Sequence, residues 1–194
     1  MSLDAGTRPA AVLASGSPQR REILERLGID FEVLASGEDE LVDGDPAEVV
    51  QANPLIKARA VAEQVGPGRL VIGCDTDVAL DGQVIGKPED EAQAREYLER
   101  LSGRTHSVFS GLALVGPGAE QLRSGLAESR VSFRELGAGE IDRYLASGEW
   151  RGRAGGYAIQ ARGSALVAAV EGEIANVIGL PIGLLLDLAP ELDL

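Results

Sequence analysis

The sequence has few of the residues on which several common kinds of site depend. It contains one cysteine, one histidine and only 4% aromatic residues in a chain of 194 residues. A single cysteine excludes an intramolecular disulfide and a cysteine-based zinc cluster, and a single histidine leaves a histidine-rich zinc site or a Ser–His–Asp triad poorly supplied. No hydrophobic run approaches the ~20 residues of a membrane-spanning helix. The groups that remain for chemistry are mostly carboxylates, lysines, arginines and hydroxyls.

Basic residues are also scarce relative to acidic ones. The chain has 18 Lys and Arg against 31 Asp and Glu, which gives a net charge of −13 and a pI near 4.5. A broad non-specific nucleic-acid surface needs a basic face, so we expect no nucleic-acid partner and little retention on DNA at physiological salt. A small phosphorylated ligand is still compatible, because local cations or a divalent metal can hold it.

The remaining composition is that of a globular protein. Hydrophobic residues make up 44% and charged residues 25% of the chain, which is enough apolar material for a sizeable core. The length suits one large α/β domain or two small lobes. Residues 1–9 are polar and lack the apolar segment of a signal peptide, so we expect a cytoplasmic protein.

Hydrophobic runs and helix signals alternate along the chain. We expect strands over 11–14, 31–35, 70–74, 78–80, 83–85, 105–115, 122–133 and 164–170, and helices over 18–27, 45–65, 89–101, 140–146 and 178–188. The segment Gly116-Pro117-Gly118 joins the two long strands, and Asn53-Pro54 is expected to break or kink the second helix. This order predicts a mixed sheet with helices on both faces, in which ligands bind beyond the carboxyl ends of strands.

The most informative segment is 13–21 (LASGSPQRR), which joins a hydrophobic strand to a helix that begins at Pro18. Proline is tolerated at the first helical position, where its missing N–H has no helical partner to lose. The loop therefore presents backbone N–H groups and the hydroxyls of Ser15 and Ser17 at a helix N-terminus, a geometry that attracts phosphate. Arg20 and Arg21 add positive charge. An ordinary strand–turn–helix corner with surface arginines gives the same pattern.

Other polar residues lie at the ends of predicted elements or in predicted loops. They are Glu40 in an acidic loop, Lys57 on a helix, Asp75 and Thr76 after a buried strand, Lys87 before Pro88, and Gln160 in a glycine-rich crossing. Cations and amide donors for phosphate, together with two acids for a hard metal, are what phosphoryl chemistry requires. Spacing alone does not bring these residues together.

Six segments, in order, resemble the signature of the Maf (septum-formation-inhibitor-like) nucleotide pyrophosphatases. They are 13–21 (LASGSPQRR), 72–76 (IGCDT), 86–88 (GKP), 101–106 (LSGRTH), 147–160 (SGEWRGRAGGYAIQ) and 177–181 (VIGLP), and together they span nearly the whole chain. The resemblance implies a single α/β domain over residues 1–194, with an elongated mixed central sheet, two lobes and a cleft, similar to the inosine-triphosphate pyrophosphatases. It also implies cleavage of a nucleoside triphosphate to the monophosphate and pyrophosphate, with Mg²⁺ or Mn²⁺.

The resemblance also implies roles for individual residues. Asp75 corresponds to the general base that activates water and, with Glu40, to a metal ligand. The residues that would hold the triphosphate and neutralise its charge are Ser15, Ser17, Arg20, Lys57 and Lys87. Each has a plainer interpretation: Asp75 as a turn or capping residue, the lysines as solvated surface residues, and Asp39 as the acid in place of Glu40.

Three positions separate the dTTP/UTP type of this family from its 7-methyl-GTP type. Here they are Gln19, Thr76 and Gln160, of which the last two fit the dTTP/UTP type and Gln19 fits neither. The amide of Gln160 can both donate and accept, which suits uracil or thymine. We therefore expect a preference for dTTP, UTP or modified pyrimidine nucleotides. The alternatives are a 7-methyl-GTP pyrophosphatase and a nucleotide-binding regulator of septum formation.

Several other features are interpreted as structural or stay open. Cys74 is expected to be a small buried strand residue rather than a nucleophile, His106 a structural residue, and Trp150 an aromatic that packs within a lobe. Asp77 and Pro54 depart from the family pattern near the expected site. Members of the family are often homodimers, but no stripe of residues in this sequence identifies an interface.

Overall fold

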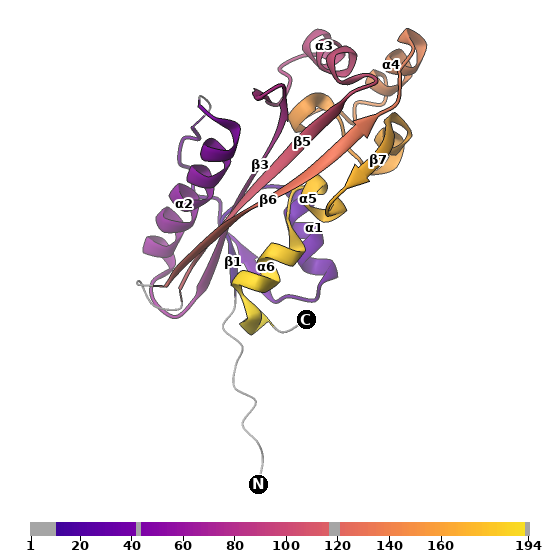
Figure 1. Cartoon of the computed structure of the whole chain (residues 1–194). Coiled ribbons are helices and arrows are strands. Elements are labelled where there is room, and N and C mark those ends of the chain that lie inside the picture. Colours follow the sequence, from indigo (N-terminus) through magenta and orange to yellow (C-terminus); the bar gives the residue numbers. More distant parts are fainter. Residues whose placement is uncertain (1–10, 42–43, 117–120, 193–194) are drawn as a thin grey trace.

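The computed structural model describes residues 11–41, 44–116 and 121–192, and one seven-stranded sheet runs through its length (Figure 1). Its strands are β1 (Ala11–Leu13), β2 (Phe31–Val33), β3 (Leu70–Leu80), β4 (Gln83–Ile85), β5 (Thr105–Val115), β6 (Leu122–Phe133) and β7 (Val167–Glu171). Their order is β2-β1-β3-β5-β6-β7, with β4 also paired to β3. β1 is parallel to β2 and β3, and the other pairs are antiparallel. The mixed α/β class predicted from the sequence is confirmed.

Helices cover both faces of the sheet. α2 (Pro46–Val65) lies on one face, while α1 (Pro18–Arg26), α5 (Ile174–Ile178) and α6 (Ile182–Leu188) lie on the other (Figure 1). α3 (Glu91–Leu101) and α4 (Ala138–Leu145) lie at the far end, with the short 3-10 helices η1 (Ala154–Gly156) and η2 (Ala161–Leu166), and η3 (Pro190–Leu192) follows α6. The Asp45 carboxylate caps α2 by accepting the N–H groups of Ala47 and Glu48.

A gap along one edge of β3 determines where a ligand can enter. β1 pairs with β3 only at Leu70–Ile72, and β4 pairs with it only at Val78–Leu80. Within the described part of the chain, the residues between these stretches, 73–77, pair with β5 alone. The middle of β3 therefore has an open edge that gives access to side chains on both faces of the sheet.

Two glycines let α2 approach the sheet closely at this gap. A Cβ added at Gly73 would lie 2.2 Å from the Pro54 carbonyl oxygen, and one added at Gly111 would lie 1.9 Å from the Val50 carbonyl oxygen. Gly111 pairs with Asp75 across the β3–β5 ladder. Because neither glycine has a Cβ, the backbone of α2 can lie directly on β3 and β5 beside Asp75. No larger residue fits at either position.

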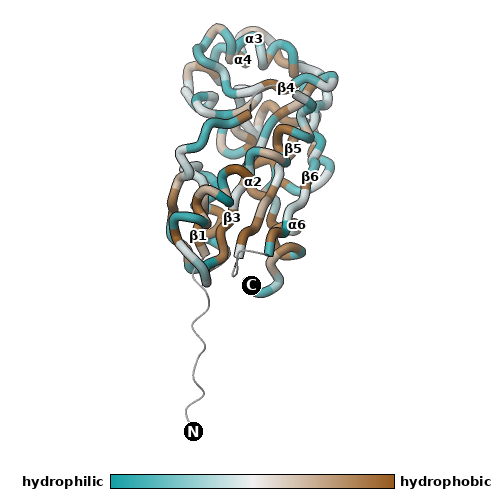
Figure 2. The backbone as a smooth tube through the Cα atoms, turned by 90° about the vertical axis from the view of Figure 1, so that its left-hand side faces the viewer, coloured by the Kyte–Doolittle hydropathy of each residue, from teal (hydrophilic) through white to brown (hydrophobic). Residues whose placement is uncertain are grey.

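The hydrophobic core lies in three clusters arranged by the alternation of side chains along the strands. Val12, Val71 and Ala113 belong to the cluster under α2, and Ile72 and Cys74 belong to the cluster on the opposite face, under α1 and α6. A third cluster, which includes Val78, lies beyond Thr76 toward α3 and α4. Hydrophobic positions accordingly follow the strands, and hydrophilic positions are frequent along α3 and α4 (Figure 2).

Two strand boundaries predicted from the sequence are wrong. The strand predicted to end at residue 74 continues to Leu80, because Asp75, Thr76 and Asp77 keep pairing with the β5 backbone although their side chains are polar. Asp75 therefore lies within a strand, at the gap, rather than beyond its carboxyl end. The strand predicted over 164–170 begins only at Val167, after η2.

One helix prediction is wrong, the break expected at Pro54 is not present, and two segments named in the predictions lie outside the described residues. The helix predicted over 45–65 is confirmed as α2, which continues through Asn53 and Pro54 without a break, because its burial against β3 and β5 outweighs the donor that Pro54 lacks. The helix predicted over 178–188 begins only at Ile182, as α6, because Gly179, with a φ of 133°, ends a separate short helix, α5, that the sequence did not predict. The remaining helices begin within two residues of their predicted starts. Residues 1–9, Pro117 and Gly118 lie outside the described residues.

Candidate functional site

A cavity of about 460 Å³ opens at the gap in β3, within the range typical of ligand sites. Its lining includes every residue that the sequence suggested for the site: Ser15, Ser17, Gln19, Arg20, Glu40, Lys57, Asp75, Thr76, Lys87 and Gln160. These residues come from α1 and the loop before it, the acidic loop, α2, β3, the loop after β4 and the glycine-rich crossing. The fold thus brings together groups that are separated by up to 145 positions in the chain (15 to 160).

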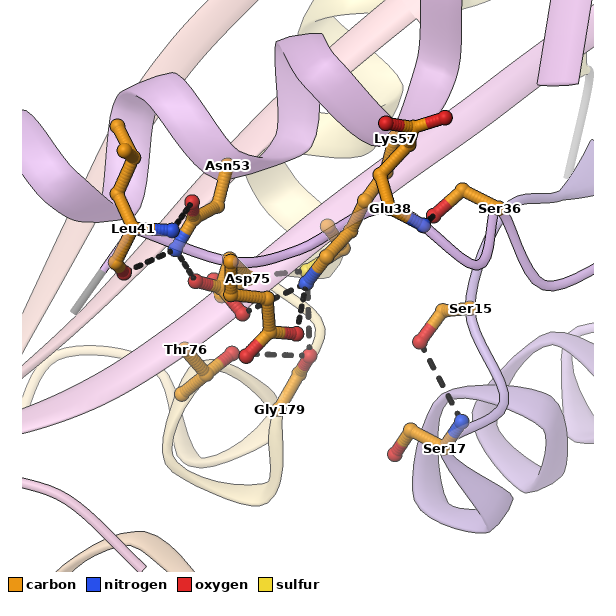
Figure 3. A network of polar contacts seen from close by, with 12 residues as sticks. Ser15, Ser17, Ser36, Glu38, Leu41, Asn53, Lys57, Asp75, Thr76 and Gly179 are labelled. Atoms are coloured by element: carbon orange, nitrogen blue, oxygen red, sulfur yellow. Dashed lines mark hydrogen bonds and ion pairs between the residues drawn. The ribbon is translucent and has the colours of Figure 1, made fainter. Parts of the chain in front are cut away.

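On the α2 face of β3, a lysine lies between two carboxylates. Lys57 Nζ is 2.5 Å from Glu40 Oε1 and 3.1 Å from Asp75 Oδ1. Lys57 and Asp75 are buried, whereas Glu40 is exposed. Asp75 Oδ2 accepts a second hydrogen bond, of 2.7 Å, from Asn53 Nδ2 (Figure 3). Both oxygens of the Asp75 carboxylate are therefore held by side chains of α2.

On the opposite face, Arg20 is buried among neutral acceptors. Its Nε donates to the Gly179 carbonyl at 2.9 Å, and its terminal nitrogens donate to Ser15 Oγ at 2.8 Å and Thr76 Oγ1 at 3.2 Å. None of the ion pairs found among the described residues includes Arg20. Burying a cation without a counter-ion is unfavourable, so this wall of the cavity is suited to an anion.

The N-terminus of α1 adjoins Arg20 and adds neutral donors to the same wall. Ser17 is the N-cap residue, yet its side chain makes no capping bond and instead donates to Gln19 Oε1 at 3.0 Å. Gly16, Pro18 and the two serines all line the cavity. The helix dipole and free N–H groups at such an end favour negative charge. The helix N-terminus expected from segment 13–21 therefore lies at the cavity, on a wall shared with Arg20.

Three residues of the site were missed by the sequence analysis. The sequence pointed to Asn53 only as a helix breaker before Pro54, although its side chain donates a hydrogen bond to Asp75. Arg153 lines the cavity from the glycine-rich crossing, where the sequence pointed to Gln160 alone. The third is Gly179, whose backbone carbonyl accepts hydrogen bonds from the side chains of Arg20, Thr76 and Cys74. Asn53 could have been noticed as a polar residue one helical turn before Lys57. The Gly179 carbonyl could not, because every residue has a backbone carbonyl.

Burial changes the pKa values of two side chains near the gap, those of Asp77 and Cys74. Burial, together with the neighbouring Asp75 carboxylate, raises the pKa of Asp77 to about 7, although the positive charge of Lys87 acts to lower it. Burial also raises the pKa of the Cys74 thiol, which keeps that thiol protonated near neutrality. Cys74 is fully buried, as expected of a strand residue rather than a nucleophile.

Glu40 and Asp75 can supply oxygen ligands to a hard divalent cation. Their carboxylates both contact Lys57 Nζ, so the two acids lie close enough together to share one cation. Among the residues that the structure describes, no group of three or more His, Cys, Asp or Glu side chains is arranged to hold a metal. Mg²⁺ is commonly bound by one or two carboxylates, with water and substrate phosphates as further ligands. The donor set therefore fits a Mg²⁺ or Mn²⁺ that binds together with a phosphorylated ligand.

The histidine and the tryptophan lie outside the cavity. His106 is buried, its Nε2 is 2.8 Å from the Tyr157 hydroxyl, and its ring contacts Phe133 edge-on. Burial lowers the pKa of His106 to about 4, so it is neutral near pH 7. Trp150 is buried in the third cluster and donates to the Leu145 carbonyl. Both have structural positions, as the sequence predicted.

In addition, none of the helices in the described ranges has the length and apolarity needed to cross a membrane.

Comparison with known proteins gives the context of this cavity. The family described as Maf-like protein matches residues 10–192. A dTTP/UTP pyrophosphatase of Deinococcus radiodurans is 44% identical over 187 residues, covering 96% of this chain and 94% of the relative. A dTTP/UTP pyrophosphatase of Moorella thermoacetica is 47% identical over 175 residues, covering 88% and 89%. Among solved structures, a nucleoside-triphosphatase (dITP/XTP pyrophosphatase) of Mycobacterium abscessus is 22% identical with a TM-score of 0.44, over 66% of this chain and 76% of that one.

The family match covers every residue that the structure describes, including the lining of the cavity. Every segment that carried the resemblance, from the loop before α1 to the turn between α5 and α6, falls within the matched residues 10–192. This protein belongs to the Maf family.

Proposed function

We propose that this chain is a nucleoside triphosphate pyrophosphatase, which cleaves the bond between the α- and β-phosphates and releases a monophosphate and pyrophosphate. The observation that carries the proposal is that one cavity has a positively charged wall and, facing it, a group with two carboxylates. Arg20 and the α1 N-terminus form a wall suited to phosphate, and the Glu40–Lys57–Asp75 group faces the same space. Relatives that are 40–47% identical and are dTTP/UTP pyrophosphatases support this reaction.

The proposed chemistry uses each wall for a different task. Arg20, Ser15, Ser17 and Lys87 hold the triphosphate, because they offer donors and positive charge to its oxygens. Asp75 accepts a proton from the attacking water as the water oxygen bonds to the α-phosphorus. The bond from that phosphorus to the bridging oxygen breaks, and the electron pair leaves with pyrophosphate. Phosphoryl transfer depends mainly on such positioning and charge stabilisation.

Lys57 orients Asp75 in this scheme and adds positive charge beside the phosphates. Its Nζ contacts Asp75 Oδ1 at 3.1 Å, and this contact fixes the orientation of the carboxylate beside the cavity. Glu40 and Asp75 are the residues that we propose to hold a Mg²⁺ or Mn²⁺. When bound, such an ion would neutralise charge on the phosphates and on the leaving group.

We further propose a preference for UTP and dTTP or for modified pyrimidine nucleotides. Gln160 is half-buried in the cavity lining, where its amide can pair with the donor and acceptor edge of uracil or thymine. Thr76 lies across the cavity on β3, and Gln19 borders the phosphate wall. The names of the relatives support the same preference.

The proposal also extends to the cellular setting. The single buried cysteine and the acidic composition support a cytoplasmic protein that makes no use of nucleic acid as a partner. A homodimer is proposed from the family resemblance alone, and size-exclusion chromatography with light scattering tests it.

The decisive test is incubation of the purified protein with separate canonical and modified triphosphates in the presence of Mg²⁺ or Mn²⁺. Pyrophosphate and orthophosphate are measured separately. Pyrophosphate release, fastest with UTP and dTTP, is the expected result. Pyrophosphate release led by 7-methyl-GTP would retain the reaction and overturn the base preference. Nucleotide binding without any release would favour a regulatory nucleotide-binding protein instead.

A further inference from the structure

Asn53 makes an unusual set of contacts for a residue inside a helix. It is 2% exposed and lies on α2, one turn before Lys57. Its Oδ1 accepts the Leu41 backbone N–H at 2.8 Å, and its Nδ2 donates to the Leu41 carbonyl at 3.0 Å. The same Nδ2 donates to Asp75 Oδ2 at 2.7 Å (Figure 3). One amide thus connects α2 to β3 and to the acidic segment 36–41.

The three partners fix the orientation of this amide. The Leu41 N–H can only donate, whereas the Leu41 carbonyl and an ionised Asp75 carboxylate can only accept. A flipped amide would therefore oppose donor to donor and acceptor to acceptor. An aspartate at position 53 has the same shape but lacks both donors, and a leucine has neither donor nor acceptor. Only an amide satisfies all three partners at this position.

Each oxygen of the Asp75 carboxylate accepts a hydrogen bond from a different residue on the same face of α2. Residues four apart on a helix are neighbours, so Asn53 and Lys57 reach the carboxylate side by side. Lys57 donates a hydrogen bond to Asp75 Oδ1, and Asn53 donates one to Asp75 Oδ2. Because Asn53 is neutral, it orients the carboxylate without adding a charge that would compete with a bound cation.

The bond to Leu41 gives Asn53 a second consequence for the site. Glu40 directly precedes Leu41 and contacts Lys57 through Oε1. Asn53 holds both backbone polar groups of Leu41, in the manner of a neighbouring strand. The position of the Glu40 carboxylate relative to Asp75 therefore depends on Asn53, although Asn53 does not line the cavity.

We propose that Asn53 is a positioning residue that fixes the Asp75 carboxylate and the 36–41 segment relative to one another. The consequence for catalysis rests on the proposed pyrophosphatase function. Asn53 touches neither substrate nor metal in this scheme and acts through Asp75 and Glu40. Asparagine is a poorer helix former than leucine, so its presence in the middle of α2 is explained by these contacts rather than by helix stability.

The test compares Asn53→Leu with Val61→Ala, using pyrophosphate release from the triphosphate that the wild type cleaves fastest. Asn53→Leu keeps a branched side chain and favours the helix but removes all three bonds. Val61 is fully buried in the same helix, so Val61→Ala lowers stability without touching Asp75 or Leu41. We expect Asn53→Leu to lower kcat by about tenfold to a hundredfold, the effect of losing a hydrogen bond to a charged group, with KM within about twofold. Val61→Ala should retain kcat.

Hydrogen exchange supplies a readout that does not need activity. The Leu41 N–H should exchange faster in Asn53→Leu, in a peptide covering 36–41, while Val61→Ala leaves this peptide unchanged. Wild-type kcat in a folded Asn53→Leu variant, or unchanged exchange of that peptide, would overturn the inference. If the wild type releases no pyrophosphate, the proposed function fails, and the exchange comparison alone decides whether Asn53 fixes the segment.

Discussion

The two faces of β3 carry different kinds of polar network at adjacent residues. Asp75 faces α2 and is paired with Lys57 and Asn53, so its charge is compensated within the protein. Thr76 faces the other way, where Arg20 is surrounded by hydroxyls and a carbonyl. One face has opposite charges in contact, and the other has a buried cation with neutral partners.

This difference assigns the two faces separate tasks. A compensated carboxylate can be held in one orientation without a ligand, which suits a group that must act on a water molecule. A buried cation among neutral acceptors gains most when an anion arrives, which suits the binding of phosphate. Changes on the α2 face should therefore act mainly on kcat, and changes on the Arg20 face mainly on KM.

The largest expected effect comes from Asp75→Asn. An amide cannot accept the proton of the attacking water, and general-base catalysis contributes about a hundredfold to ten-thousandfold, so we expect kcat to fall by about a thousandfold. Steady-state pyrophosphate release measures it. The matched control is Asp81→Asn, an exposed acid one residue beyond the end of β3 whose positive φ of 54° asparagine tolerates. If Asp75→Asn turns over like Asp81→Asn while remaining folded, Asp75 is not the base.

Arg20→Met tests the opposite face. Loss of the guanidinium removes three donors and the positive charge of the phosphate wall, so we expect KM to rise by about tenfold to a hundredfold with a smaller change in kcat. The adjacent Arg21 is exposed and pairs with Glu25 on the surface of α1, so Arg21→Met is the control and should leave both constants unchanged. A fall in kcat with unchanged KM would contradict the division between the faces.

Asp77 sharpens the comparison, because it is an acid on the α2 face whose charge is not fully compensated. Its pKa is about 7 in the folded protein, whereas an unfolded aspartate ionises near pH 4. The folded state therefore binds the proton more tightly between these values, so ionisation of Asp77 lowers the free energy of unfolding as pH rises from about 4 to about 7.

Replacement of the Asp77 carboxylate by a neutral amide should therefore stabilise the protein at high pH but not at low pH. We expect Asp77→Asn to be more stable than the wild type by at least about 1 kcal/mol at about pH 8, and equally stable at about pH 4, by denaturant unfolding. The same difference at both pH values would show that the effect arises from something other than the charge of Asp77.

Local patterns in the sequence predicted most elements of this fold but not the gap that creates the site. Hydrophobic periodicity and the glycines at turns place β5, β6 and α3 within two residues of their observed bounds. The polar residues Asp75 to Asp77 suggested the end of a strand, because one sequence does not reveal that β5 continues to pair with them. That pairing is a long-range contact, and it places Asp75 in the middle of the sheet.

The residues of the candidate site were predicted largely through the family resemblance, and their roles stay predictions. All ten line one cavity, which spacing alone could not have established. Asn53 was missed because its function depends on a backbone 12 positions away and a carboxylate 22 positions away. The internal bonds of Arg20 were also beyond reach, since they require the turn between α5 and α6 to return Gly179 to α1.

The smallest expected effect, and the finest test of the two faces, comes from Thr76→Val. Valine keeps the shape of threonine but removes the hydroxyl that accepts from Arg20 and contacts Ser110 Oγ at 2.9 Å. Arg20 keeps its charge and its bonds to Gly179 and Ser15, so we expect KM for UTP to rise by only about threefold, at the low end of the loss for one hydrogen bond, with kcat unchanged. Thr76→Ser retains the hydroxyl and should behave as the wild type. A loss of kcat in Thr76→Val approaching that of Asp75→Asn would mean that the two faces of β3 act as one unit, because a residue bonded only on the Arg20 side would then control the chemistry on the α2 side.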